Sequence, residues 1–342
     1  MLHEAIQQLV EGRHLTQEQA YETLAEVMRG EATEAQIGAL LVALRMKGEE
    51  PAEVAGFAQA MRDHALAVVT RHDCVVDTCG TGGDAPDTFN ISTAAAFVVA
   101  GAGVPVAKHG NRAVSSPCGS ADVLRELGVQ IDLPPDAVGR CLDELGIAFL
   151  FAVALHPAMS HAAGARRELG LRTIFNVLGP LANPAGAKRQ LLGAYSPQAA
   201  RLMAYALRDL GSEHALVVHG ADGLDEISTT GPTLAVEVRG EVLTEFELTP
   251  EQFGLPRAEL ADLAGGDPAQ CAAILREVLS GAPGPARDIV VLNAGAGIYV
   301  GGRAETLAEG LTQAAASIDS GAALAKLEGL CKLSVQLKEG SP

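Results

Sequence analysis

The stretch at residues 77–84, DTCGTGGD, constrains the fold more than any other part of the chain. It follows Cys74-Val75-Val76, a short apolar run that is typical of a buried parallel strand. Glycine fills three of the four positions 80–83, which leaves the backbone of the following turn nearly bare. Such a turn can take positive φ angles and bring its N–H groups close to phosphate oxygens. We therefore expect an α/β fold with a phosphate-binding loop at the end of this strand.

A second element suited to anions follows closely. The sequence N-I-S-T at 90–93 precedes the apolar run 94–100, which places Ser92 and Thr93 where a helix would start. The first N–H groups of a helix are free and lie at the positive end of its dipole. Two phosphate-binding elements so close together predict a ligand with more than one phosphate.

Length and composition narrow the class of protein. A chain of 342 residues favours about two domains and is long enough for a large core. Aromatic residues make up only 4% and Trp is absent, which indicates closely packed α/β layers rich in Gly and Ala. The chain has no apolar run of about 18 residues, and an N-terminus with Glu4, Glu11 and Arg13 does not resemble a signal sequence. We expect no membrane association and a cytoplasmic location.

Charge and cysteine content exclude further classes. A net charge of −17 argues against binding to nucleic acid or an anionic membrane, so an anionic substrate needs a local basic pocket. The six cysteines form no CxxC pair, which predicts reduced thiols rather than disulfides or zinc ligands. Cys79 and Cys118 lie in motif loops, and we expect them to be small packed thiols rather than nucleophiles.

The first seventy residues have the signals of a helical unit. Two T-x-x-Q sequences, at 16–19 and 33–36, fit the capping box that opens a helix. Gly30 and Gly48 stand where helices would end, and Pro51 suits the first turn of another.

The helix expected after Thr33 has an apolar stripe at helical spacing. It consists of Ile37, Leu40, Leu41 and Leu44. The stripe fits either a core face or a contact between helices of two copies of the chain, and spacing alone leaves both open.

From Cys74 the pattern changes to alternating strands and helices, as expected of a parallel sheet that binds ligands at the carboxyl ends of its strands. The expected strands are 75–78, 104–108, 147–151, 190–194, 215–219 and 289–292. The expected helices are 121–127, 137–145, 157–169, 199–210 and 269–279, with two more between 304 and 337. We place the joint between the domains at 68–73, which gives a helical domain at 1–70 and an α/β domain at 71–342.

A basic loop follows the second expected strand. The sequence K-H-G-N-R-A-V-S-S at 108–116 continues to Gly119-Ser120, where another helix would start. Lys108, His109 and Arg112 offer cationic donors, and the serines offer neutral ones. In so acidic a chain, such a loop beside the glycine-rich turn predicts anion binding rather than a plain surface turn.

Two charged pairs have a bland and a functional interpretation. Arg166 and Arg167 near the end of a helix are compatible with simple compensation of the helix dipole. Asp225-Glu226 follow an expected strand, where they form either an acidic surface turn or ligands of Mg²⁺. Mg²⁺ prefers one or two carboxylates together with substrate phosphates, so the two phosphate loops favour the metal.

Four motifs, in this order and spacing, closely resemble those of the anthranilate phosphoribosyltransferase family. They are G-T-G-G-D at 80–84, N-I-S-T at 90–93, K-H-G-N-R at 108–112 and D-E at 225–226. The resemblance covers essentially the whole chain, and the motif residues show no departure.

The resemblance implies a small N-terminal all-helical domain, completed by a segment near 166–184. This domain packs on a larger α/β domain with a mainly parallel sheet flanked by helices. The resemblance also implies a homodimer through the helical domain. The implied reaction transfers the phosphoribosyl group of 5-phosphoribosyl 1-diphosphate to the amine of anthranilate, giving N-(5-phosphoribosyl)anthranilate and pyrophosphate in L-tryptophan biosynthesis. An anthranilate synthase partner would be a separate protein, because the chain has no room for a glutamine amidotransferase domain.

The same resemblance assigns roles to individual residues. The phosphoribosyl donor would contact Gly80, Gly83, Asp84, Thr88, Asn90, Ile91, Ser92, Thr93, Lys108, His109, Gly110, Asn111, Arg112, Ala113, Val114, Ser115, Ser116 and Ser120. Mg²⁺ would be held by Ser92, Asp225 and Glu226. Anthranilate would meet Gly80, Asn111 and Arg166. The role of His109 stays open between a hydrogen bond to the acceptor and orientation of the loop.

Two rival functions fit parts of the pattern. A pyrimidine nucleoside phosphorylase has a similar domain plan and a glycine-rich loop for free phosphate, but the basic loop and the D-E pair fit the transferase better. A non-catalytic nucleic-acid-binding homologue should show a basic groove and eroded motifs, and this chain has neither in its sequence.

Overall fold

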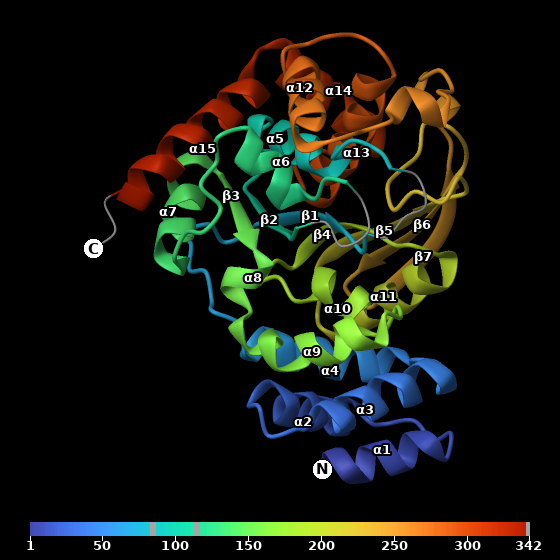
Figure 1. Cartoon of the computed structure of the whole chain (residues 1–342). Helices are drawn as coiled ribbons and strands as arrows, with labels where there is room; N and C mark the ends of the chain where they lie inside the picture. Colours follow the sequence, from blue (N-terminus) through green and yellow to red (C-terminus); the bar gives the residue numbers. More distant parts are fainter. Residues whose placement is uncertain (83–86, 113–116, 340–342) are drawn as a thin grey trace.

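The computed structural model describes residues 1–82, 87–112 and 117–339. A twisted sheet separates two groups of helices, with the N-terminal helices at one end of the molecule (Figure 1). The helices of the sheet-containing part are α5 (Ile91–Gly101), α6 (Ser120–Glu126), α7 (Pro135–Leu145), α8 (Ala152–Leu155), α9 (Ser160–Leu169), α10 (Phe175–Leu181), α11 (Pro197–Asp209), α12 (Pro268–Leu279), α13 (Pro285–Val300), α14 (Leu307–Asp319) and α15 (Ala322–Glu339). None of the described helices has both the length and the apolar character needed to cross a bilayer.

The N-terminal part forms the helices that its capping signals predict. These are α2 (Gln17–Met28), α3 (Glu34–Lys47) and α4 (Pro51–Asp63), and α1 (Leu2–Val10), which no capping signal predicts, precedes them. Both capping boxes are present, α4 begins at Pro51, and Gly48 ends α3 with a φ of 88°. The stripe of α3 is at most 2% exposed within the single chain, so the core-face interpretation is confirmed.

The sheet has seven strands in the order β3-β2-β1-β4-β5-β6-β7. Its strands are β1 (Val76–Gly80), β2 (Val106–Gly110), β3 (Ile147–Phe151), β4 (Arg189–Gly193), β5 (His214–Gly220), β6 (Thr233–Arg239) and β7 (Val242–Leu248). The first five in this spatial order pair in parallel, and β6 and β7 are antiparallel. The α/β class and five of the expected strands are confirmed, with boundaries shifted by one or two residues.

One expected strand is wrong, and two strands were not expected. Residues 289–292 lie inside α13, which is buried on nearly all sides. A helix enclosed in this way is apolar all round, so its sequence loses the helical period and a short stretch of it resembles a buried strand. The hairpin β6–β7 does alternate in polarity around Gly240, a signal typical of a two-residue turn.

The two faces of the sheet belong to two different cores. One core holds α5 to α7 and α12 to α15, and the other runs from β4, β5 and β6 through α11 into the N-terminal helices (Figure 1). Helices α9 and α10 join the second core, where α9 packs against α2 and α3 and α10 against α4. Segments 2–61 and 162–182 thus share one packed interior.

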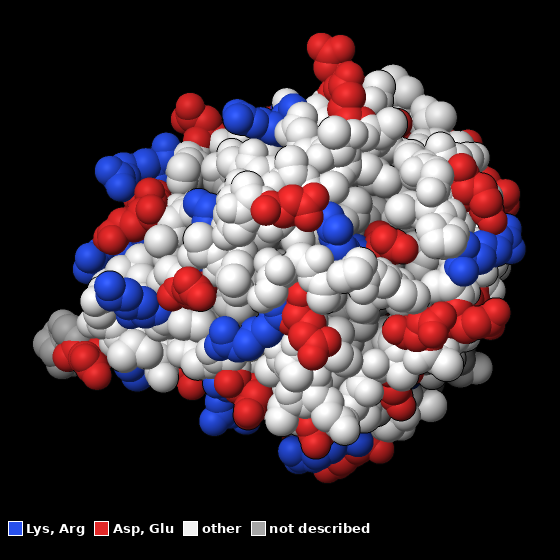
Figure 2. Space-filling view, turned by 90° about the horizontal axis from the view of Figure 1, so that it is seen from above, with Lys and Arg blue, Asp and Glu red and all other residues white. Residues whose placement is uncertain are grey.

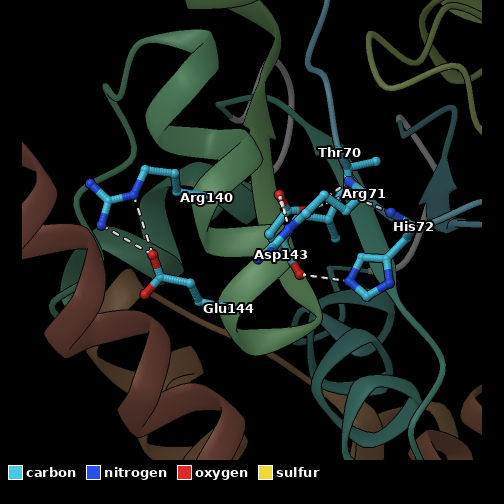
Figure 3. A network of polar contacts seen from close by, with 7 residues as sticks. Thr70, Arg71, His72, Arg140, Asp143 and Glu144 are labelled. Carbon is cyan, nitrogen blue, oxygen red and sulfur yellow. Dashed lines mark hydrogen bonds and ion pairs between the residues drawn. The ribbon is translucent and has the colours of Figure 1, made fainter.

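The segment between α4 and β1 is fastened to α7. Asp143 accepts hydrogen bonds from Thr70 Oγ1 (2.6 Å) and from the backbone N–H of Arg71 (2.8 Å), and the Arg71 guanidinium pairs with its other oxygen (Figure 3). His72 Nε2 bonds the Leu142 carbonyl at 3.1 Å. The expected joint at 68–73 therefore follows a fixed path along the surface of α7.

Candidate active site

The topology places a switch point between β1 and β4, the position at which a ligand-binding crevice is expected in an open α/β sheet. From β1 the chain runs outward to β2 and β3, then returns to β4 on the other side of β1 and continues to β5. Ligands of open α/β sheets bind outside the carboxyl ends of the strands at such a switch point. Gly80 and Gly193, the last residues of β1 and β4, pair across this point.

The glycine-rich turn begins in the crevice and encloses a carboxylate. Gly82 takes a φ of 64°, and its N–H donates to Asp225 Oδ2 at 2.8 Å. A methyl group on Gly80 would lie 2.9 Å from Asp225 Cγ, and one on Gly193 would lie 3.0 Å from Asp225 Cβ. These two positions therefore require glycine, since Asp225 fills the space that any side chain would need.

The acidic pair reaches both of the segments predicted to bind phosphate. Glu226 Oε1 accepts the N–H of Ser92 in the first turn of α5 at 3.0 Å, while Asp225 faces the turn after β1. Asp225 is 8% exposed, and burial raises the pKa of its carboxyl group. The structure thus brings Ser92 close to the Asp225-Glu226 pair, which lies more than 130 positions later in the sequence.

The donor atoms of this cluster fit a magnesium ion. Two carboxylates and a hydroxyl are hard oxygen ligands, which Mg²⁺ prefers. Across residues 1–82, 87–112 and 117–339, no group of three or more His, Cys, Asp or Glu side chains is placed to hold a metal by itself. Phosphate oxygens and waters would therefore complete the coordination, as is usual for Mg²⁺.

Lys108 puts a buried positive charge beside this cluster. Its side chain leaves β2, and its ammonium donates to the Thr78 carbonyl and to Ser92 Oγ, the latter at 3.2 Å. The residue is only 3% exposed. An ammonium in this position faces any anion bound between β1 and the start of α5.

The ring of His109 is neutral and has a fixed orientation. Its Nδ1 bonds the Gly179 carbonyl at 3.1 Å, and the ring lies 5.1 Å from that of His156. Burial is the main cause that lowers the pKa of His109 to about 3 and that of His156 to about 4. Both Nε2 atoms are buried, and neither has a hydrogen-bond partner among the residues that the structure describes. Because a carbonyl only accepts, we assign the proton of His109 to Nδ1, which leaves an unused acceptor at Nε2.

The described part of the basic loop closes onto α6. The Asn111 carbonyl accepts from Ser120 Oγ at 3.2 Å and from the Ala121 N–H at 3.1 Å. The Arg112 guanidinium lies 5.6 Å from the centroid of the Phe151 ring. The loop after β2 therefore returns to the helix that starts with Ser120.

Arg166 is partly buried, unlike its exposed neighbour Arg167. Its guanidinium stacks 4.8 Å from the centroid of the Phe175 ring, and burial lowers its pKa. Arg167 fits the dipole interpretation better, because it stays solvated at the end of α9. A stacked guanidinium keeps its edge free to bind a planar carboxylate.

Other predicted residues have structural contacts or lie outside the description. Thr88 forms a β-bridge with Ala264, and Asn90 Nδ2 donates to the Cys118 carbonyl at 3.1 Å. Cys79 and Cys118 are buried and free, so the prediction of packed thiols is confirmed. The positions outside the described residues are Gly83, Asp84, Ala113, Val114, Ser115 and Ser116.

Four residues in or beside the crevice were given no role from the sequence. They are Asp77, His156, Asn183 and Gly193. Asp77 precedes the glycine-rich turn and His156 precedes the helix with Arg166, so both stood next to recognised signals. Asn183 and Gly193 had no local signal, because their roles depend on distant segments.

Comparison with known proteins agrees with this geometry. Residues 72–324 match the glycosyl transferase family a/b domain, and residues 3–65 match its helical bundle domain. A relative named anthranilate phosphoribosyltransferase from Moorella thermoacetica is 57% identical over 330 residues, covering 96% of this chain and 97% of that protein.

Solved structures are equally similar. Anthranilate phosphoribosyltransferase from Thermus thermophilus superposes with a TM-score of 0.93 at 45% identity, covering 97% of this chain and 99% of that one. The Saccharomyces cerevisiae protein in complex with PRPP and Mg gives 0.89 at 29% identity, covering 98% of both chains. The same yeast protein has also been solved in complex with 4-fluoroanthranilate.

A helical bundle joined to this α/β domain, with a glycine-rich turn at the switch point, defines a member of the glycosyl transferase family with these two domains. Within that class, the identity and coverage of its relatives are decisive. The chain belongs to the anthranilate phosphoribosyltransferase family.

Proposed function

We propose that the chain transfers the phosphoribosyl group of 5-phosphoribosyl 1-diphosphate to the amine of anthranilate, as a step of L-tryptophan biosynthesis. One observation carries the proposal. At the switch point, the turn after β1, the start of α5 and the Asp225-Glu226 pair converge on Lys108 and Ser92. This arrangement suits a substrate with a diphosphate and a bound metal ion.

The donor would bind along the loops after β1 and β2 and at the start of α5. We assign to it the described residues Gly80, Thr88, Asn90, Ile91, Ser92, Thr93, Lys108, His109, Gly110, Asn111, Arg112 and Ser120. The yeast relative in complex with PRPP and Mg supports this assignment. Ser92, Asp225 and Glu226 would hold Mg²⁺, which would neutralise part of the charge on the diphosphate.

The acceptor would bind between the crevice and the helical part. Arg166 offers a fork for the carboxylate of anthranilate, and Gly80 and Asn111 would contact the rest of the ring system. The buried Nε2 of His109 has no proton to donate to the carboxylate, because the ring is neutral and its proton lies on Nδ1, so its one possible bond to the acceptor is from the amine N–H. The 4-fluoroanthranilate complex of the yeast relative supports an acceptor of this shape.

The chemistry needs no strong base. The aromatic amine is neutral at pH 7, so its nitrogen can attack C1 of the ribose as the bond from C1 to the diphosphate breaks. The diphosphate leaves with the electron pair, and the amine loses one proton. Lys108 and backbone N–H groups stabilise the charge that develops on the leaving group, so positioning and electrostatics supply most of the rate. We expect no covalent intermediate with the protein.

The remaining assignments concern organisation. We propose that residues 1–70, with the segment near 166–184, form the helical domain on the α/β domain of 71–342, and that two copies associate through it. The shared core of α1 to α4 with α9 and α10 supports the division.

We place the enzyme in the cytoplasm, in keeping with its six free cysteines, with any anthranilate synthase as a separate protein. Figure 2 shows acidic and basic side chains interspersed on one face, which favours small substrates over nucleic acid.

The decisive experiment follows the fluorescence of anthranilate mixed with the purified protein, 5-phosphoribosyl 1-diphosphate and Mg²⁺. We expect a fall in signal that requires every component and is abolished by EDTA. No fall with the folded protein would overturn the proposal, and phosphorolysis of a pyrimidine nucleoside would then identify the rival function. Sedimentation velocity at micromolar concentration tests the homodimer, and a monomer would reject it.

A further inference from the structure

A buried carboxylate that the proposed reaction does not use lies next to the crevice. Asp77, in β1, has no exposed surface. Its Oδ1 accepts the backbone N–H of His109 at 2.9 Å, and its Oδ2 accepts Asn183 Nδ2 at 2.7 Å. The Cys79 thiol also points to Oδ2, at 3.4 Å. Burying an isolated charge costs much free energy, so a buried carboxylate needs hydrogen-bond donors, and these three groups supply them.

The partner amide can present only its N–H₂ group to Asp77. Asn183 is 2% exposed, and its Nδ2 also donates to the Ala107 carbonyl at 2.8 Å. Its Oδ1 accepts the Ala185 N–H at 2.8 Å. A flipped amide would lose both of these bonds, which fixes its orientation.

Each of these three hydrogen-bond partners of Asp77 is thus a donor. A carboxylate accepts at both oxygens, whereas an amide or a carboxylic acid at position 77 would place one of its own N–H or O–H groups against a donor. Burial raises the pKa of Asp77, while the hydrogen bond from Asn183 and the positive charge of Lys108 act in the opposite direction. Position 77 therefore requires an acceptor-only side chain.

The two residues join three segments of the crevice. Asp77 belongs to the strand that enters the glycine-rich turn, and its bond to the His109 N–H holds the strand that ends in the basic loop. Asn183 follows α10, whose Gly179 carbonyl orients the His109 ring. The pair therefore fixes the backbone of Lys108 and His109 relative to the turn after β1.

We infer that Asp77 and Asn183 form a positioning pair that aligns Lys108 and His109 for phosphoribosyl transfer. The inference rests on the proposed function, because it assigns the aligned side chains to that reaction. Neither residue contacts the crevice through a free polar atom, so both act through the residues they hold. A displacement of about 1 Å in such groups lowers kcat by about 100-fold.

The test compares Asp77→Asn, Asn183→Ala and the exchanged double variant Asp77→Asn/Asn183→Asp. Asp77→Asn removes one acceptor while keeping the shape of the side chain. At saturating substrates and at a temperature well below the melting temperature, we expect its kcat to fall about 100-fold. The exchange keeps the charge and one donor–acceptor contact, but it sets a carboxylate against the Ala107 carbonyl, so we expect no recovery over Asp77→Asn, and a recovery would contradict the requirement for an acceptor-only side chain at position 77. Ser317→Ala is the matched control, because it deletes a buried hydrogen bond of α14 to the Val98 carbonyl, on the far side of α5.

A second readout does not depend on activity. The ¹⁵N resonances of the His109 ring report which nitrogen carries the proton, and we expect the Nδ1–H form in the wild type and a mixture of forms in Asp77→Asn. A wild type without transferase activity would refute the proposed function alone. An active wild type with kcat of Asp77→Asn and Asn183→Ala within about threefold of it, or with an equal loss in Ser317→Ala, would overturn the positioning role. If Asp77→Asn does not fold, Asn183→Ala decides the question in the same way.

Discussion

The glycine at position 80 offers a sharp test of the site, because a methyl group there would collide with the Asp225 carboxylate. The added carbon would lie 2.9 Å from Asp225 Cγ and nearer still to Oδ2, so the carboxylate must move by roughly 1 Å to reach an ordinary contact. Relief of such overpacking costs about 1–3 kcal/mol. The movement also strains the bond from the Gly82 N–H, which is 2.8 Å long in the wild type.

In Gly80→Ala we expect this cost to appear in the metal dependence of the reaction. Since about 1.4 kcal/mol corresponds to a tenfold change in affinity, the Mg²⁺ concentration for half-maximal rate should rise about 10- to 100-fold. The assay is the initial rate of anthranilate consumption over a Mg²⁺ titration, with a melting temperature for each variant.

The matched control is Gly56→Ala, at the crossing of α2 and α4. Its methyl group would lie 2.9 Å from Ala20 Cβ and nearer still to the Gln17 carbonyl oxygen, so the crowding is at least as severe but remote from the carboxylates. We expect Gly56→Ala to lower the melting temperature and leave the Mg²⁺ titration in place. An unchanged titration for Gly80→Ala, or an equal shift in both variants, would refute the assignment of Asp225 to the metal.

Three further predictions follow from single side chains. Arg166→Ala should raise the KM for anthranilate about 10- to 100-fold and leave that for the donor nearly unchanged, because charged hydrogen bonds to one carboxylate are lost; equal changes in steady-state assays would reject that role. His109 and His156 have folded pKa values of about 3 and about 4, below the usual 6.5, so unfolded chains bind more protons as pH falls below 6.5. In urea unfolding, the free energy of unfolding should therefore be highest above pH 6.5 and fall steeply toward pH 5, by up to about 1.4 kcal/mol per histidine and pH unit. A free energy that does not change with pH would contradict the burial of both histidines in the neutral form. Burial acts to raise the pKa of Glu237, but hydrogen bonds from His214 and Tyr299 outweigh it and lower the pKa to about 2. Glu237 thus stabilises the fold above pH 4.5 and loses this effect as pH falls through about 2, so Glu237→Gln should lower the unfolding free energy at pH 7 by about 1–3 kcal/mol in the same assay. An equally stable variant would show that these bonds add nothing.

The sequence predicts the elements whose signals are local. The capping boxes, Gly48 and Pro51 located the N-terminal helices, because a cap needs only residues a turn apart. The strands that enter the phosphate loops were found because glycine-rich turns follow buried apolar runs. The same logic misplaced residues 289–292, since a helix buried on nearly all sides has no periodic signal.

The motif residues of the site can be predicted from the sequence, but the residues that hold them in position cannot. Nothing near Gly193 in the sequence indicates that Asp225 will fill the space beside it, and nothing near Asn183 indicates a bond to Asp77, 106 positions away. Such requirements arise only when β1 and β4 become neighbours. The polar groups that hold a site together therefore need the tertiary structure to be found.

The shared core of the N-terminal helices with α9, α10 and α11 also shapes how the protein can be made. Helices α1 to α4 leave the ribosome before α9 to α11, and apart from Cys79 their buried partners begin with Ala162, in α9, about 100 residues after Met61, the last buried apolar residue of α4. At about 5–20 residues per second, this apolar surface stays uncovered for about 5–20 s during synthesis. The nascent helical unit is thus the part of the chain most exposed to chaperones and to premature self-association, long before any crevice exists.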